Sequence, residues 1–141
     1  MPRLIKSFNV KPRDFIRAGE ASIKVKEVLK AVGFEEDVIR RSSVCAYEAE
    51  MNIVMYGGDG NISLIAGPEK ITLDITDNGP GIENIEMALV EGYSTSSKEY
   101  REMGFGAGMG LPNIKKNSDF LEINSQKGKG THLKIGFKVN G

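Results

Sequence analysis

The sequence lacks several features that mark common classes of protein. It has one cysteine and one histidine in 141 residues, which excludes an internal disulfide and argues against a zinc site. No apolar run approaches the roughly 20 residues of a membrane-spanning helix, and the N-terminus shows no signal-peptide pattern. Basic and acidic residues both number 19, so no positive excess favours nucleic acid or anionic membranes. We therefore expect a protein that binds neither nucleic acid nor a membrane. The single cysteine fits the reducing cytoplasm.

What is present is typical of one globular domain spanning residues 1–141. Hydrophobic residues make up 40% and charged residues 27% of the chain, as in soluble proteins. Apolar periodicity predicts a first strand, two long helices, a hairpin, a short amphipathic segment, a third helix and two closing strands. Their expected ranges are 3–10, 12–33, 35–56, 62–66, 70–77, 85–89, 112–118 and 131–139, and the strand before the last begins at Leu121.

The stretch Asp77-Asn78-Gly79-Pro80-Gly81-Ile82 organises the chain. Ile71, Leu73 and Ile75 alternate with polar residues, which predicts a strand with one buried face, and Asp77 falls in their register. A buried carboxylate needs a partner, and one could come from outside the chain. The glycines that follow let the backbone approach a ligand closely. Taken alone, the stretch is more typical of a strand that ends in a plain Asn-Gly turn.

Glu48 and Asn52 lie four residues apart on the second predicted helix, at the margin of its apolar stripe. Two ordinary boundary residues of the core would explain the pair equally well. The functional interpretation gives each of the two residues a specific chemical role. The side-chain oxygen of Asn52 can ligate Mg²⁺ together with phosphate oxygens, and Glu48 can act as general base on an attacking hydroxyl.

Glycine occupies every second position from Gly104 to Gly110, and Pro112 opens the third predicted helix. A glycine-rich loop that leads into a helix offers N–H groups and a positive dipole end to phosphates. The spacing fits neither the dinucleotide fingerprint nor the P-loop, and Gly128-Lys129-Gly130 also lacks the P-loop ending. A merely flexible loop is the alternative. The polar segment before the loop, about residues 83–103, is predicted to be a lid.

Three single residues complete the set. Thr131 begins the inner face of the last strand, where its hydroxyl can bond a ligand beside Asp77. His132 faces solvent in the alternation and is given no catalytic role. Cys45 is expected to be a small core residue.

Together these motifs resemble the Bergerat-fold (GHKL) ATPases, a superfamily that includes gyrase, Hsp90, histidine kinases and mismatch-repair ATPases. The motifs that carry the resemblance are Glu48 with Asn52, Asp77-x-Gly79-x-Gly81, Gly104-x-Gly106-x-Gly108-x-Gly110-Leu111 and Gly128-x-Gly130-Thr131. The resemblance implies an α+β fold, a two-layer α/β sandwich with a mixed β-sheet, helices packed on one face and ATP bound between the layers.

The resemblance also implies roles for individual residues. Asp77 would accept the adenine amino group, Asn52 would hold Mg²⁺ with the ATP phosphates, and Glu48 would be catalytic. The other expected cofactor contacts lie in the turn, the lid, the glycine loop and the last strand: Gly79, Gly81, Ile82, Lys98, Arg101, Gly104, Gly106, Gly108, Met109, Gly110, Leu111 and Thr131.

Within the superfamily the chain is most similar to small bacterial anti-sigma serine kinases and stress-response switch kinases. Glu48-Ala49-Glu50-Met51-Asn52 and Glu91-Gly92-Tyr93-Ser94-Thr95 carry this likeness. It implies a serine/threonine protein kinase that phosphorylates a small regulatory partner, with a sigma factor and a second copy of the chain as further candidate partners. Tyr56 stands where anti-sigma kinases commonly carry His, which argues against a sigma factor. The charged segment Lys98–Met103 makes the lid longer than that of a switch kinase.

Two other interpretations stay open. The chain could be an ATP-gated protein-binding module, or an ATPase without protein kinase activity, although Glu48 argues for chemistry on a hydroxyl. A detached histidine-kinase catalytic domain is the third interpretation. We expect no dimerisation helix with a phosphoacceptor histidine ahead of the ATP domain, and His132 on its strand cannot replace one.

Overall fold

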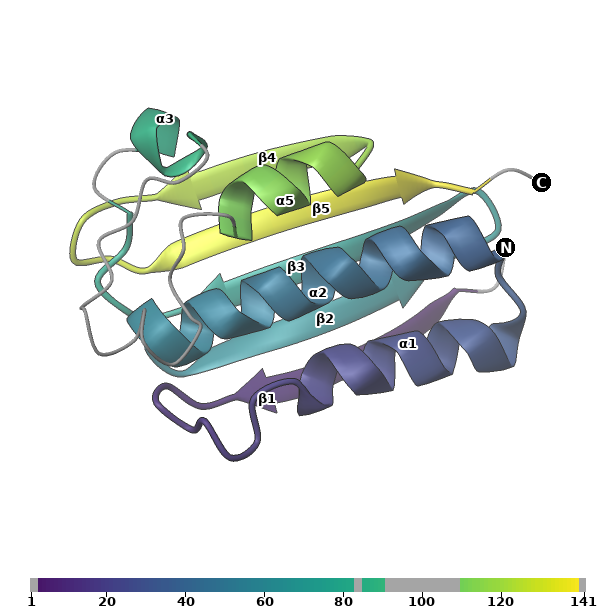
Figure 1. Cartoon of the computed structure of the whole chain (residues 1–141), viewed down its shortest axis with the longest axis horizontal. Coiled ribbons are helices and arrows are strands. Elements are labelled where there is room, and N and C mark those ends of the chain that lie inside the picture. The colour runs from purple at the N-terminus through teal and green to yellow at the C-terminus, as the bar shows by residue number, and fades with distance from the viewer. Residues whose placement is uncertain (1–2, 83–84, 91–109, 140–141) are drawn as a thin grey trace.

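Five strands form one sheet, and the long helices cover one of its faces (Figure 1). The computed structural model describes residues 3–82, 85–90 and 110–139. Among them, no helix is long and apolar enough to cross a bilayer. The elements are β1 Leu4–Val10, α1 Glu20–Val32, α2 Glu36–Tyr56, β2 Gly60–Ala66, β3 Lys70–Asp77, α3 Ile85–Ala88, α5 Gly110–Asn117, β4 Phe120–Ser125 and β5 Thr131–Lys138.

The predicted two-layer α+β fold is confirmed, but the expectation of a mixed sheet is corrected. The strand order is β1-β2-β3-β5-β4, and each described pairing is antiparallel. The chain passes from β3 through α3 and α5 to β4, which runs in the same direction as β3. The last strand, β5, then folds back between them and pairs with both. The insertion of β5 therefore removes the parallel contact that such a crossover would otherwise create.

The core lies between the sheet and the two long helices, α1 and α2. Eight large apolar residues on the inward face of the three central strands are at most 3% exposed: Ile62, Leu64, Ile71, Leu73, Ile75, Leu133, Ile135 and Phe137. Each such burial contributes roughly 1.5–3 kcal/mol. Cys45 lies in the same core, its thiol donates to the Ile114 carbonyl at 3.6 Å, and burial raises the pKa of that thiol to about 12. The prediction of a core cysteine is confirmed.

Helix α1 begins at Glu20 rather than near Pro12, where the sequence predicts it. Arg13 has a φ of 64° and Gly19 a φ of 100°, and both values are left-handed, so a right-handed helix cannot run through them. The Arg13 N–H instead donates to the carbonyl of Val54 on α2 at 2.7 Å. The apolar periodicity gave no sign of this, because it records side chains and not backbone conformation.

A buried carboxylate from α2 holds the start of α1. Glu50 is 2% exposed, and its two oxygens accept hydrogen bonds from the backbone N–H groups of Gly19, Ala21 and Ser22 at 3.0, 3.2 and 3.0 Å. The first N–H groups of a helix lack partners within the helix, and the dipole there favours negative charge. Glu50 therefore caps α1 from another helix, a role that the sequence analysis missed.

Glu50→Ala should lower the free energy of unfolding by about 2 kcal/mol, because it leaves buried N–H groups without an acceptor. Urea denaturation measures the change. The matched control is Glu27→Ala, an exposed glutamate on α1, which should change stability by about 0.5 kcal/mol or less. Equal urea midpoints for the two variants would show that the cap adds nothing.

Candidate functional site

Asp77 ends β3 with its carboxylate anchored through one oxygen. Its Oδ1 accepts hydrogen bonds from the N–H groups of Gly79 at 2.8 Å and Gly58 at 3.2 Å. The side chain is half-buried, and in the described part of the chain no donor contacts Oδ2. The sequence predicts that this carboxylate has a partner, and backbone N–H groups supply partners for its Oδ1 atom.

The turn after Asp77 is packed tightly between two other segments. A Cβ added at Gly79 would lie 2.4 Å from the backbone nitrogen of Gly58, just beyond the end of α2. A Cβ at Gly81, which has a φ of 80°, would lie 2.2 Å from the carbonyl oxygen of Gln126. Real Cβ atoms do not approach backbone so closely, so both positions require glycine. Gly79 and Gly81 therefore allow a close approach of the chain's own backbone, and their predicted approach to a ligand stays a prediction.

Ser125, which the sequence analysis missed, ties this turn to the last strand. Its hydroxyl oxygen accepts from the N–H of Ile82 at 2.7 Å and lies 2.9 Å from the hydroxyl of Thr131. Thr131 pairs directly with Asp77 across β3 and β5, so the expected neighbourhood of these two residues is confirmed. The available signal for Ser125 was its place two residues after Ile123, on the inward face of β4.

Glu48 and Asn52 both lie at the contact between α2 and the start of α5. Both side chains are half-buried. Asn113 donates a hydrogen bond through Nδ2 to Oε2 of Glu48 at 2.9 Å. A Cβ added at Gly110 would lie 3.1 Å from Oδ1 of Asn52. The N-terminus of α5, the end that favours anions, therefore lies beside the carboxamide oxygen of Asn52.

This site fits Mg²⁺ held mainly by a nucleotide. In residues 3–82, 85–90 and 110–139, no group of three or more His, Cys, Asp and Glu side chains could hold a metal ion. Mg²⁺ commonly takes one or two protein oxygens and completes its shell with phosphate oxygens and water. The Oδ1 atom of Asn52, beside a helix N-terminus suited to phosphates, is such an oxygen.

Other predicted contacts have different outcomes. Leu111 is 7% exposed and belongs to the hydrophobic core cluster, so its expected contact with a cofactor stays a prediction. Most of the lid, 83–84 and 91–103, lies outside the described residues. The same holds for six expected contacts: Lys98, Arg101, Gly104, Gly106, Gly108 and Met109.

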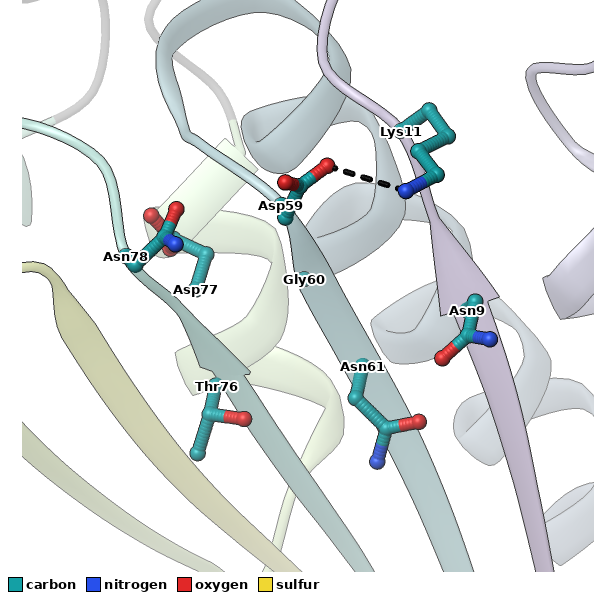
Figure 2. A pocket seen from close by; sticks show the side chains of 8 residues that line it. All are labelled: Asn9, Lys11, Asp59, Gly60, Asn61, Thr76, Asp77 and Asn78. Carbon is teal, nitrogen blue, oxygen red and sulfur yellow. Dashed lines mark hydrogen bonds and ion pairs between the residues drawn. The ribbon is translucent and has the colours of Figure 1, made fainter.

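A pocket opens on the face of the sheet opposite α1 and α2, at the ends of β1, β2 and β3 (Figure 2). It is lined by Asn9, Lys11, Asp59, Gly60, Asn61, Thr76, Asp77 and Asn78. Lys11 and Asp59 form an ion pair at its rim, at 3.2 Å. Successive strand residues point to opposite faces, so Thr76 faces this pocket while Asp77 turns toward the helices. No residue of α2 or α5 lines this pocket, but Asp77 does, so the pocket adjoins the candidate site at the end of β3.

His132 lies on the same face of the sheet, opposite α1 and α2, and is 43% exposed, as the alternation predicts. Its Nε2 lies 2.6 Å from Oδ1 of Asp74 on the neighbouring strand. It therefore stands apart from Glu48 and Asn52, which lie on the helical layer.

Residues 38–141 match the family model described as histidine kinase-, DNA gyrase B-, and HSP90-like ATPase. The matched span contains all the residues that the sequence assigns to the site. Among curated proteins, the serine/threonine-protein kinase RsbT of Bacillus subtilis (strain 168) is 32% identical over 112 residues, covering 77% of this chain and 78% of that kinase. The anti-sigma F factor of Thermoanaerobacter sp. (strain X514) is 34% identical over 93 residues. That alignment covers 62% of each protein, less than two thirds of the anti-sigma factor.

Solved structures share the fold. A chain of the SiaB–SiaC complex from Pseudomonas aeruginosa has a TM-score of 0.58 and 14% identity, covering 95% of this chain and 89% of that chain. The mycobacterial sensor histidine kinase MprB has a TM-score of 0.55 and 14% identity, covering 97% of this chain and 99% of that one. At this identity the likeness shows the arrangement of helices and strands alone.

Proposed function

We propose a function from one premise: this chain belongs to the histidine kinase-, DNA gyrase B-, and HSP90-like ATPase family. It binds ATP and transfers the γ-phosphoryl group to a serine or threonine hydroxyl of a small partner protein, as a kinase of the anti-sigma and switch-kinase type. RsbT, named a serine/threonine-protein kinase, supports this reaction class at 32% identity over most of both chains.

The observation that carries the proposal is the pair of side chains on α2. Glu48 and Asn52 are one helical turn apart and both meet the start of α5. Bound Mg²⁺ would neutralise charge on the phosphates, with Oδ1 of Asn52 as its protein ligand. The N-terminus of α5 offers N–H groups to the same phosphates.

Glu48 then acts on the partner's hydroxyl. Its carboxylate takes the hydroxyl proton while the new bond forms between that oxygen and the γ-phosphorus. The bond from the γ-phosphorus to the bridging oxygen of ADP breaks, and ADP leaves. Asp77 fixes the far end of ATP, because its Oδ2 accepts a hydrogen bond from the adenine amino group.

The partner in this proposal is a small regulatory protein that carries the acceptor serine or threonine. The anti-sigma F factor relatives favour a regulatory circuit in which partners are exchanged. A sigma factor is a further candidate, and Tyr56 at the end of α2 argues against it. A second copy of the chain is another. Purification of the tagged chain from its own cells, followed by mass spectrometry, would identify which of them associates.

Asn52→Ala should weaken ATP binding in Mg²⁺ and leave it unchanged in EDTA, because the variant removes a metal ligand. A loss of about tenfold is expected, equal to about 1.4 kcal/mol. Calorimetric titration with and without Mg²⁺ measures both states. The control is Asn61→Ala, an asparagine on the opposite face of the sheet. Equal losses in Mg²⁺ and in EDTA would instead make Asn52 a packing residue.

The proposed activity is tested by incubating the chain with γ-labelled ATP, Mg²⁺ and the co-purified partner. The expected product is a partner phosphorylated on serine or threonine. If the partner binds only in the presence of ATP and receives no label, the chain is an ATP-gated binding module. If label appears only as free phosphate, it is an ATPase without kinase activity.

A further inference from the structure

Helices α2 and α5 are joined by a row of polar contacts that runs in opposite directions along the two helices. Residues of α2 at successive helical turns meet residues of α5 in reverse order, and each contact is a hydrogen bond. The pairs are Arg41 Nη1 with the Asn117 carbonyl at 3.0 Å, Cys45 Sγ with the Ile114 carbonyl at 3.6 Å, and Asn113 Nδ2 with Glu48 Oε2 at 2.9 Å.

The third contact differs from the other two. The first two reach backbone carbonyls of α5 and serve to dock that helix. The contact between Glu48 and Asn113 joins two side chains, and one of them is the proposed general base. Its direction is also informative, because Asn113 donates to a carboxylate, which gives a stronger bond than one between neutral groups.

We propose that Asn113 is a positioning residue that holds the carboxylate of Glu48 in the orientation used for phosphate transfer. This inference rests on the proposed kinase function. A glutamate side chain has several rotatable bonds, and Glu48 is only half-buried, so packing alone does not fix its carboxylate. The bond to Oε2 fixes it and directs Oε1 toward the partner's hydroxyl.

The position of Asn113 in the chain gives this bond a second consequence. Asn113 lies one helical turn after Gly110, the first residue of α5 and the last glycine of the loop expected to cover the phosphates. Gly110 in turn lies beside Asn52, the proposed metal ligand, since a Cβ added at Gly110 would lie 3.1 Å from Oδ1 of Asn52. One short helix therefore touches both the metal ligand and the base. The orientation of Glu48 depends on α5 being docked against α2.

An ordinary structural role for the Asn113 side chain explains less. Asparagine is a weak helix former, so the helix itself gains nothing from it. The backbone carbonyl of Asn113 accepts a bond from Asn117 Nδ2 at 2.9 Å, and this bond survives a change of the Asn113 side chain. What the side chain itself supplies is the donor to Glu48.

Asn113→Ala should lower the rate of phosphate transfer to the co-purified partner about tenfold, the loss expected when a hydrogen bond to a charged group is removed. ATP affinity, measured by calorimetry, should stay within about twofold. Asn113→Asp keeps the shape but sets a carboxylate against Glu48, so it should transfer phosphate no faster than Asn113→Ala. The matched control Asn117→Ala removes an asparagine of the same helix that does not contact Glu48, and it should retain the parent rate.

A double-mutant cycle separates positioning from general damage. In a Glu48→Gln background, Asn113→Ala should cause less than about a twofold further loss, because its effect passes through the carboxylate. A full tenfold further loss, or a parent rate in Asn113→Ala alone, would overturn the positioning role and leave the kinase proposal intact. A parent protein that transfers no phosphate to its partner would instead overturn the kinase proposal, and this inference with it.

Discussion

Glu48→Gln is expected to reduce phosphate transfer to the partner by about 10²–10⁴-fold, the usual contribution of a general base. The substitution keeps the length and shape of the side chain and removes its negative charge. A neutral carboxamide cannot take the hydroxyl proton as the bond to phosphorus forms. ATP affinity should stay within a few-fold, because the nucleotide is held at Asp77, Asn52 and the N-terminus of α5 in the proposed complex.

The measurement pairs a γ-labelled ATP transfer assay with calorimetric titration of ATP. Glu27→Gln is the control, since Glu27 is an exposed glutamate on α1 and should transfer phosphate at the parent rate. If Glu48→Gln binds ATP normally and still transfers phosphate at the parent rate, Glu48 is not the base. If it loses ATP binding as well, the residue acts in holding the nucleotide.

The fold was predictable wherever side-chain periodicity carries the information. Strand β3 is an example, because its apolar residues Ile71, Leu73 and Ile75 alternate with polar ones and all three are at most 2% exposed. Helix α2 is another, since both of its ends were predicted to within one residue. In these elements the period of the apolar residues matches the backbone conformation, so the periodicity of the sequence correctly predicts the helix or strand.

Prediction failed where backbone geometry or strand order decides the outcome. The left-handed φ values of Arg13 and Gly19 prevent α1 from beginning before Glu20, and they leave the apolar pattern of the sequence unchanged. The position of β5 between β3 and β4 depends on which edges of the sheet meet in space. Such long-range pairing leaves no trace in the period of any single strand.

The residues of the candidate site also fall into two groups: those that the sequence pattern indicates and those that it does not. Glu48, Asn52 and Asp77 could be proposed from the sequence because carboxylates and carboxamides are unusual at the margin of an apolar pattern. Glu50 and Asn113 were missed because their partners lie on other helices, 28 to 31 and 65 residues away in the chain. A polar residue whose partner is distant in sequence looks, in one dimension, like any other polar helical residue.

Asp77→Asn should weaken ATP binding by about 100-fold. The substitution removes a charge-assisted hydrogen bond and places an N–H donor of the asparagine opposite the N–H donor of the adenine amino group. The asparagine oxygen can keep the two internal bonds that Asp77 Oδ1 accepts from Gly58 and Gly79. Its amide nitrogen then takes the place of Oδ2 and faces the adenine amino group. The flipped rotamer would set that nitrogen against two backbone N–H groups, which disfavours it. The variant therefore tests recognition while preserving the local fold.

The same geometry predicts a change in base preference. Guanine carries an oxygen acceptor where adenine carries its amino group, so the amide nitrogen of Asp77→Asn can donate to it. The ratio of ATP to GTP affinity should fall, as measured by calorimetric titration with each nucleotide in Mg²⁺. Asp59→Asn is the matched control, because Asp59 is an exposed acid near the same end of the sheet that pairs with Lys11, and it should bind both nucleotides like the parent. Asp77→Ala loses the internal bonds as well, so it should also unfold at lower urea, whereas Asp77→Asn should not. Parent-like ATP affinity in Asp77→Asn would place adenine recognition elsewhere in the chain.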